Sequence, residues 1–355
     1  MKRRVAITGL GLASSQGEGR EAHSALLKGA APALDETRFA PYPVHPLVPL
    51  PFEKAIPRRE LRQMETWQRL GVYAAGLAID DAALRDGVAE MDLVVAAGGG
   101  ERDTALDEQI LAIRPDEATR HRMLMDGLRP TLFLAQLSNL LAGSISITHN
   151  VAGSSRTLLG EEIAGAEAVR VLAARIAAGS SERGLVGAAF AAERYDQLLL
   201  YALGGVLHAG AWQPLPQRQG IVFGSAAAFM TLEDADTAKA PIAILSHIAT
   251  DQGAARTRPA RLEQLLAAVP ERRPGCLVIS TATGAADPTR DELAALGATP
   301  DLFSADLIGH SVEAAFPVGL ALGALAVQAG APQVLVTGTG QWRGEAVALL
   351  EAPSA

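Results

Sequence analysis

The residues best placed for chemistry in this sequence stand at the starts of two stretches of small residues. Glu162 precedes a small-residue helix predicted over residues 166–179. His310 opens a second helix, which is predicted to end at Gly330. A helix N-terminus favours a charged carboxylate by about 0.3–1 kcal/mol when the group is exposed, so Glu162 is expected to be a weak nucleophile. A histidine such as His310 can donate a hydrogen bond to an oxyanion.

Both residues also have a structural interpretation. Glu162 can be a carboxylate that stabilises the helix start, and His310 a packing histidine bonded to nearby backbone. The other histidines are His23, His45, His121, His149, His208 and His247. No pair has metal-ligand spacing and Cys276 is the single cysteine, so no metal site is predicted. The glycines that follow the first strand lack dinucleotide-binding spacing, so no nucleotide cofactor is predicted.

The composition indicates a large buried core. The chain has 355 residues, of which 49% are hydrophobic, and a net charge of −8. The acidic balance and the lack of a basic run argue against nucleic acid as a partner. No apolar run is long enough to span a bilayer, and the first residues lack the apolar segment of a signal peptide. A cytoplasmic location without a membrane span is therefore expected.

Short apolar strands alternate with helical stretches, and these elements must position Glu162 and His310. The predicted strands are 5–9, 93–97, 184–187, 277–280 and 333–337, and the predicted helices include 67–83, 165–178 and 318–329. The alternation is typical of an α/β protein whose central strands are covered by helices on both faces. The proline-rich residues 39–57 are expected to form an irregular surface segment.

The order of elements occurs twice along the chain. A helix that begins after Gly160 is followed by a strand, and so is a helix that begins after Gly309. Such internal similarity predicts two related α/β halves, which we assign to residues 1–240 and 241–355.

Four motifs resemble those of β-ketoacyl synthases and occur in the same order. They are Arg4–Gly11 at the start, Arg218–Glu233 in mid-chain, Gly309-His310 before a small-residue helix, and Gly338–Gln341 near the end. The resemblance covers nearly the whole chain. It implies a thiolase-like α/β fold, with two duplicated βαβαβαββ halves in a five-layer α/β/α/β/α sandwich, usually as a dimer.

Those enzymes use a cysteine and two histidines, and the resemblance places these three positions at Glu162, Thr283 and His310. The cysteine position is Glu162 because it lies seventeen residues before Gly179, where the helix ends. Other family positions fall at Ala305 for a lysine, near Thr339 for a gating phenylalanine and at Ser225 for an acidic residue. Two of the three catalytic residues are thus replaced.

Acyl transfer through a thioester needs a soft nucleophile, and a carboxylate would have to form an acid anhydride instead. Condensation by this chain alone is therefore not expected. Chain length factors, which are inactive-looking partners of a true ketosynthase, are similar at this position, where Glu161 and Glu162 precede Gly165. The resemblance implies a partner subunit in fatty acid, aryl polyene or polyketide synthesis. Its partners would be a ketosynthase and an acyl carrier protein, with the carrier's phosphopantetheine arm in place of any cofactor of its own.

Three alternatives remain at the level of sequence. The chain can be a malonyl-carrier decarboxylase or an atypical acyltransferase that uses Glu162 and His310. It can also be a homodimeric acyl-binding protein without a synthase partner. A shift in the alignment of a few residues would move the nucleophile position to Ser154 or Ser155, although this breaks the seventeen-residue spacing.

Overall fold

Strands form the centre of the molecule, and the computed structural model describes residues 3–128 and 136–353. The strands are β1 (Val5–Ser14), β2 (Gly17–Glu18), β3 (Val44–His45), β4 (Asp92–Ala96), β5 (Ser155–Leu158), β6 (Arg183–Phe190), β7 (Phe223–Gly224), β8 (Ala226–Asp234), β9 (Ala243–Asp251), β10 (Leu277–Ser280), β11 (Leu302–Phe303), β12 (Gln333–Thr339) and β13 (Glu345–Glu351). The five predicted strands are all confirmed, and β1 continues beyond its predicted end.

Helices cover these strands on both sides. They are α1 (Gly19–Leu27), α2 (Arg58–Leu61), α3 (Thr66–Asp81), α4 (Thr104–Ile113), α5 (Glu117–Gly127), α7 (Leu140–His149), α8 (Glu162–Ala177), α9 (Tyr195–Leu203), α10 (Arg258–Ala267), α11 (Ala286–Leu296), α12 (Ser304–Leu307) and α13 (Ala315–Gln328). Short 3₁₀ turns are η1 (Phe52–Lys54), η2 (Val88–Glu90), η3 (Ala255–Thr257) and η4 (Val312–Ala314). The three predicted helices correspond to α3, α8 and α13 and are confirmed. None of the helices in the described ranges is long and apolar enough to cross a membrane.

The strand order is the same in the two parts of the large sheet. One part runs β5-β4-β6-β8-β1 and the other runs β11-β10-β12-β13-β9. In each part the first three strands are parallel and the last two are antiparallel to their neighbours. The parts join where β1 pairs with β9, between residues 5–7 and 243–245. The boundary at residue 240 stays a prediction, and it falls in the connection between β8 and β9.

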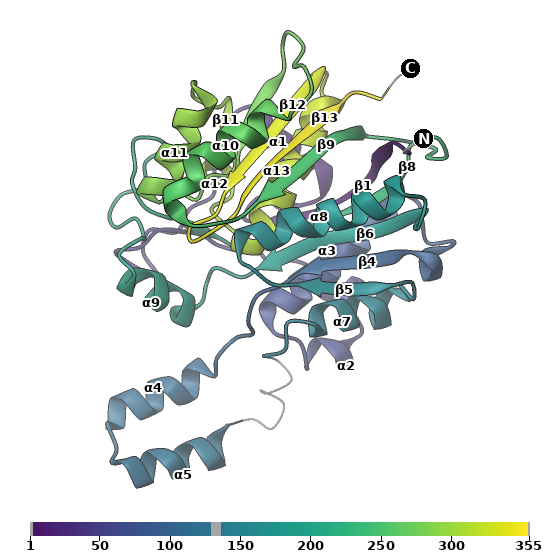
Figure 1. Ribbon diagram of the computed structural model, residues 1–355. Helices are drawn as coiled ribbons and strands as arrows, with labels where there is room; N and C mark the ends of the chain where they lie inside the picture. Colours follow the sequence, from purple (N-terminus) through teal and green to yellow (C-terminus); the bar gives the residue numbers. More distant parts are fainter. Residues whose placement is uncertain (1–2, 129–135, 354–355) are drawn as a thin grey trace.

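Five layers result, as the sequence predicts (Figure 1). Helices α8 and α13 pack against each other between the two parts of the sheet, while α3 and α7 cover one outer face and α10 and α11 the other. Every residue from Ala315 to Val327 in α13 is buried, as expected for a helix that is apolar on all sides. At Gly319 an added Cβ atom would lie 2.3 Å from Thr281 Cγ2, so only glycine permits this packing.

The predicted surface segment at residues 39–57 is partly wrong. Val44 and His45 form β3, which pairs in parallel with β7, and both residues are fully buried. The proline-rich stretch therefore supplies a short strand to the interior, because its backbone finds hydrogen-bonding partners in β7. Burial lowers the pKa of His45 to about 3, so this histidine is neutral.

A helical arm formed by α4 and α5 extends away from the layered body (Figure 1). It exposes four large apolar side chains, Leu111, Ile113, Met125 and Leu128. Helices α4 and α5 pack mainly against each other and make few contacts with the layered body. An apolar surface of this kind on an extended arm is typical of an interaction site.

Candidate functional site

A strained turn connects β5 to α8 and presents two glutamates. Glu161 has φ 54° and ψ −135°, a backbone conformation that non-glycine residues rarely adopt. The preceding Gly160 has φ 147°. The two side chains diverge, since Glu161 is partly exposed beside Arg343, at 3.3 Å, whereas Glu162 is 7% exposed. The turn therefore delivers one carboxylate to the surface and the next to the interior.

Glu162 and His310 meet in the interior although 148 residues separate them. His310 Nε2 lies 3.0 Å from Glu162 Oε1, and both side chains are buried. The backbone of His310 is held on both sides: its N–H donates to Val222 O at 2.8 Å, and its carbonyl accepts from Gly224 N at 3.0 Å. Its ring also stacks on Phe223. These contacts fix the imidazole so that Nε2 faces the start of α8.

The space beside Glu162 is very small. Thr281, Phe316, Thr339 and Gly340 line it together with Glu162, and the cavity measures about 10 Å³. That is about the smallest volume that holds one water molecule. Glu162 Oε2 and His310 Nδ1 have no hydrogen-bonding partner among the described residues. No acyl group fits into the space beside the pair.

Thr283, the predicted position of the first histidine, does not line this cavity. Its side chain is fully buried, and its hydroxyl accepts from Ala285 N at 3.1 Å in the turn before α11. Thr281 lies beside Glu162 instead and donates its hydroxyl to Thr337 O at 3.0 Å. Thr281 directly follows β10. Residues after the carboxyl ends of parallel strands lie at one edge of the sheet, so this position in the sequence could have indicated that Thr281 lies at the site.

The other positions carried over from the family hold no titratable group near the pair. Thr339 lines the cavity, Ala305 is buried, and Ser225 accepts from Ala192 N at 2.9 Å. Ser154 and Ser155 are exposed at the start of the edge strand β5, seven or more residues before α8 begins, so neither stands at a helix start.

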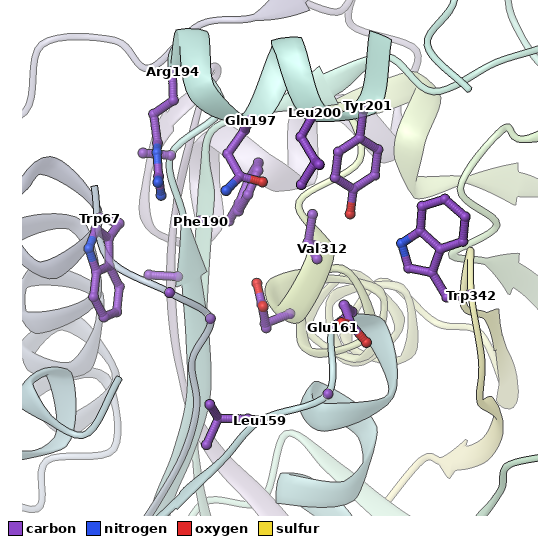
Figure 2. Close-up of a pocket in the computed structure, with 16 residues that line it drawn as sticks. Trp67, Leu159, Glu161, Phe190, Arg194, Gln197, Leu200, Tyr201, Val312 and Trp342 are labelled. Carbon is purple, nitrogen blue, oxygen red and sulfur yellow. The ribbon is translucent and has the colours of Figure 1, made fainter. Parts of the chain in front are cut away.

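A second, larger pocket of about 280 Å³ lies on the outer side of the strained turn (Figure 2). Its walls include Glu161, Glu313 and the aromatic rings of Trp67, Tyr201 and Trp342. Figure 2 shows Gln197, Leu200 and Tyr201 of α9 pointing into this space. The sequence analysis missed this pocket, because its walls come from six separate stretches of chain.

Glu313 is the buried titratable group of this pocket. It is 6% exposed, and burial, together with the nearby carboxylates of Glu162 and Glu161, raises its pKa to about 7. A Cβ atom added to Gly98 would lie 2.5 Å from Glu313 Oε1, so this glycine leaves room for the carboxyl group. The sequence feature that could have indicated this residue is its position as the single charged side chain in an apolar, small-residue run.

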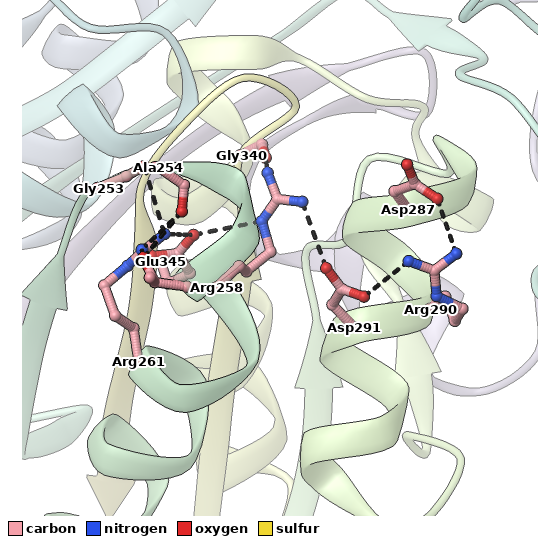
Figure 3. A network of polar contacts seen from close by, with 10 residues as sticks. Gly253, Ala254, Arg258, Arg261, Asp287, Arg290, Asp291, Gly340 and Glu345 are labelled. Carbon is pink, nitrogen blue, oxygen red and sulfur yellow. Dashed lines mark hydrogen bonds and ion pairs between the residues drawn. The ribbon is translucent and has the colours of Figure 1, made fainter.

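A buried ion-pair network holds the loop that closes the small cavity (Figure 3). Glu345 is fully buried and accepts from Arg261 Nε at 2.6 Å and from Arg258 Nε at 3.3 Å. Arg258 also reaches the carbonyl oxygen of Gly340 at 3.4 Å. At Gly344, where φ is 88°, a Cβ atom would lie 2.4 Å from Ile163. The loop is therefore pressed against the start of α8 and anchored to α10.

Among the residues that the structure describes, no group of three or more histidine, cysteine, aspartate or glutamate side chains is arranged to hold a metal ion. The site consists of the buried Glu162–His310 pair, the closed cavity and the outer pocket.

Residues 49–238 match the model of the β-ketoacyl synthase N-terminal domain family. This match spans more than half of the chain, so the protein belongs to the β-ketoacyl synthase family. Comparison with curated protein sequences gave no match.

Solved structures with the same fold include several ketosynthase assemblies. The ishigamide ketosynthase/chain length factor is similar with a TM-score of 0.84 and 21% identity, over 100% of both chains. A type II polyketide synthase acyl-carrier protein in complex with its ketosynthase bound to the hexaketide gives 0.76 and 19%, over 99% of this chain and 100% of that one. The PfaC keto synthase-chain length factor gives 0.77 and 16%, over 100% of this chain and 43% of that one. These similarities confirm the thiolase-like fold class.

Proposed function

We propose that this protein is a chain-length-factor-like subunit, which pairs with an active ketosynthase and does not catalyse condensation by itself. The observation that carries the proposal is the buried hydrogen bond between Glu162 and His310, at 3.0 Å, where Glu162 occupies the position that the resemblance assigns to the family's cysteine. The substrate would be a chain growing on an acyl carrier protein, in fatty acid, aryl polyene or polyketide synthesis. That the chain grows on an acyl carrier protein, and that it belongs to one of these three pathways, is likewise proposed.

The chemistry of the pair supports the absence of condensation. A carboxylate is a poor acceptor for a thioester-bound acyl group, and Glu162 is already engaged by His310. The first histidine of the family has no counterpart, because Thr281 and Thr283 cannot act as a base or as a charged donor. A cavity of about 10 Å³ leaves no room for the end of a pantetheine arm.

The surface supports a protein partner. Strand β5 lies at the end of the sheet and pairs only with β4 on its inner side, so its outer edge has free backbone groups. Leu159, directly after β5, is 68% exposed. The arm of α4 and α5 adds Leu111, Ile113 and Met125, each more than half exposed. A ketosynthase with a matching edge strand would satisfy these groups and bury this apolar surface.

Co-expression with a ketosynthase that retains the cysteine and both histidines tests the proposal. We expect a one-to-one complex that elongates chains from malonyl-carrier protein only when both subunits are present. The control is the same ketosynthase with its cysteine replaced, which should abolish the activity of the complex. A chain that stays a homodimer beside the ketosynthase would contradict the partner role.

The same assay separates the alternatives. Carbon dioxide release from malonyl-carrier protein by this chain alone would establish a decarboxylase, and acyl transfer by this chain alone would establish an acyltransferase. Glu162→Ala should abolish either activity if it uses the Glu162–His310 pair. A stable homodimer with bound lipid and neither activity would indicate an acyl-binding protein.

A further inference from the structure

The outer pocket combines aromatic walls with a buried carboxyl group whose one recorded hydrogen bond comes from its own backbone N–H. Trp67, Phe190, Tyr201 and Trp342 supply the aromatic surface. Glu313 lies among them, 6% exposed, and no other described side chain forms an ion pair or a hydrogen bond with its carboxyl group. An unpaired carboxylate in a largely buried position is costly unless a ligand with the opposite charge or a donor reaches it.

The one cation in the pocket wall is already neutralised. Arg194 donates to both carboxylate oxygens of Asp196, at 3.1 and 2.6 Å, and to the carbonyl oxygen of Gly100, at 2.8 Å. Its guanidinium group forms no recorded hydrogen bond or ion pair with Glu313, although its positive charge opposes the rise in the pKa of that carboxyl group. Glu161 adds a second negative charge at the rim, where its only ion-pair partner, Arg343, is exposed. The pocket thus has an excess of negative charge.

The aromatic rings provide the other half of a cation site. Trp342 is 51% exposed and lies 6.4 Å from Tyr201, between ring centroids, at the mouth of the pocket. Trp67 is almost fully buried on another wall. Electron-rich ring faces attract a desolvated cation within about 6 Å, and the attraction is strongest for tryptophan. A volume of about 280 Å³ accommodates a small organic molecule, but not a long chain.

We propose that the outer pocket binds a small organic cation, such as an alkylammonium ion, between the carboxylates of Glu313 and Glu161 and the rings of Trp342, Tyr201 and Trp67. The apolar side chains of Leu159 and Leu200, which also line the pocket, would contact the alkyl part of the ligand. An apolar acyl chain would instead have to cover the carboxyl group of Glu313, which costs free energy. The proposal does not depend on the chain-length-factor role, since it rests on the carboxylates and the aromatic rings of the pocket and not on a partner subunit.

Titration of the purified protein with n-butylammonium chloride tests the proposal, with tryptophan fluorescence as the readout. Trp67 and Trp342 line the pocket, whereas Trp212 lies elsewhere, against Arg218. We expect saturable binding that 1-butanol, butyrate and potassium chloride at matched ionic strength do not reproduce. Equal or tighter binding of butanol or butyrate would overturn the proposal, and so would the lack of saturation by butylammonium.

Two variants assign the binding to Glu313. Glu313→Gln keeps the shape of the side chain but removes its charge, and should weaken butylammonium binding by about tenfold or more. Glu263→Gln changes an exposed residue of α10 and should leave the affinity unchanged. Unchanged affinity in Glu313→Gln, with the fold verified by circular dichroism, would show that the cation binds elsewhere.

The pH dependence gives an independent readout. Glu313 faces Glu161 and Glu162 from the start of α8 and Arg194 from the start of α9, and its pKa is raised to about 7. The ionised form binds a cation better, so affinity should rise between about pH 6 and about pH 8 in the wild-type protein. This rise should disappear in Glu313→Gln. An affinity that falls with pH in this range would contradict the site.

Discussion

Glu162 and His310 lie in contact at the positions that the sequence resemblance assigns to the family site, and their contact fills most of the space there. The carboxylate takes the space in front of the imidazole, and Gly340 and Thr339 cover it. A Cβ atom at Gly340 would lie 3.2 Å from Glu162 Oε2. The glutamate is therefore integrated into the packing of the site.

We expect Glu162→Cys to give no condensation product from acyl- and malonyl-carrier proteins. The thiol would stand at a helix start, which favours the thiolate, but the position beside it is Thr281 and no first histidine is present. Product formation can be followed by mass spectrometry of the carrier. Adding Thr281→His to Glu162→Cys should introduce an imidazole next to residue 162, whereas adding Thr283→His should not. Activity in the Thr283→His double variant, with none in the Thr281→His double variant, would contradict this geometry.

Glu313 should make stability depend on pH. Its folded-state pKa of about 7 lies above its ordinary value of 4.5, so the folded protein holds this proton more tightly than the unfolded chain. The stability linked to this proton is fully present below about pH 4.5 and is lost as pH rises through about 7. Glu313→Gln should therefore stabilise the protein relative to wild type at pH 8 by up to about 3 kcal/mol, and little at pH 5.

Chemical denaturation at the two pH values measures this difference. Glu263→Gln, on the exposed surface of α10, is the matched control and should show no pH-dependent difference from wild type. A gain in Glu313→Gln that is equal at both pH values would mean that Glu313 does not titrate between them.

At the scale of elements, α10 fixes the loop between β12 and β13. Arg258 and Arg261 both come from α10 and both bind Glu345 at the start of β13 (Figure 3). Arg258 also reaches Asp291 of α11, at 3.5 Å. Glu345 thus binds two arginines of α10, and Arg258 links this pair to α11 and to the loop that covers Glu162.

Glu345→Ala should lower the free energy of unfolding by about 3–5 kcal/mol, because it leaves two buried guanidinium groups without their shared partner. Thermal or urea denaturation measures the loss. Glu263→Ala, a change at an exposed residue of α10, should alter stability by less than about 0.5 kcal/mol. A loss in Glu345→Ala as small as in this control would show that the network is not a stabilising link.

At the scale of the whole molecule, the large sheet ends at β5, and this open edge is where the proposed partner would bind. Ser154 O and Leu158 O accept from the β4 side, from Leu93 N and Ala97 N. Because a parallel strand alternates its bonding sides, the backbone groups of Ser155 and Thr157 face outward. The N–H of Thr157 is thus available to a strand of another subunit.

Thr157→Pro should abolish complex formation with the ketosynthase while the chain still folds, since it removes an outward N–H and no bond to β4. Thr157→Val retains the backbone donor and should assemble normally. Size-exclusion chromatography of the co-expressed proteins measures both variants. Normal assembly of Thr157→Pro would show that the partner does not bind along β5.

The sequence by itself determined the class of fold, the order of the two similar halves, and the identity of the family. The fold class could be read because small-residue helices alternate with the apolar strands β4, β6, β10 and β12. The family could be read because four of its motifs occur in order along the chain. These signals are local, and a single chain displays them directly. The turn at Glu162 could also be located, since the length of α8 fixes its distance from Gly179.

Only the tertiary structure decided which residues share a site. The pairing of β10 with β12 brings Thr281, not Thr283, beside Glu162. The packing of η4 against β6 and α8 buries Glu313 next to Gly98. The proline-rich stretch at residues 39–57 yields a buried strand because β7 supplies its partner. Each of these contacts joins residues far apart in the chain. Their distances depend on the docking of complete elements, which spacing along the sequence does not reveal.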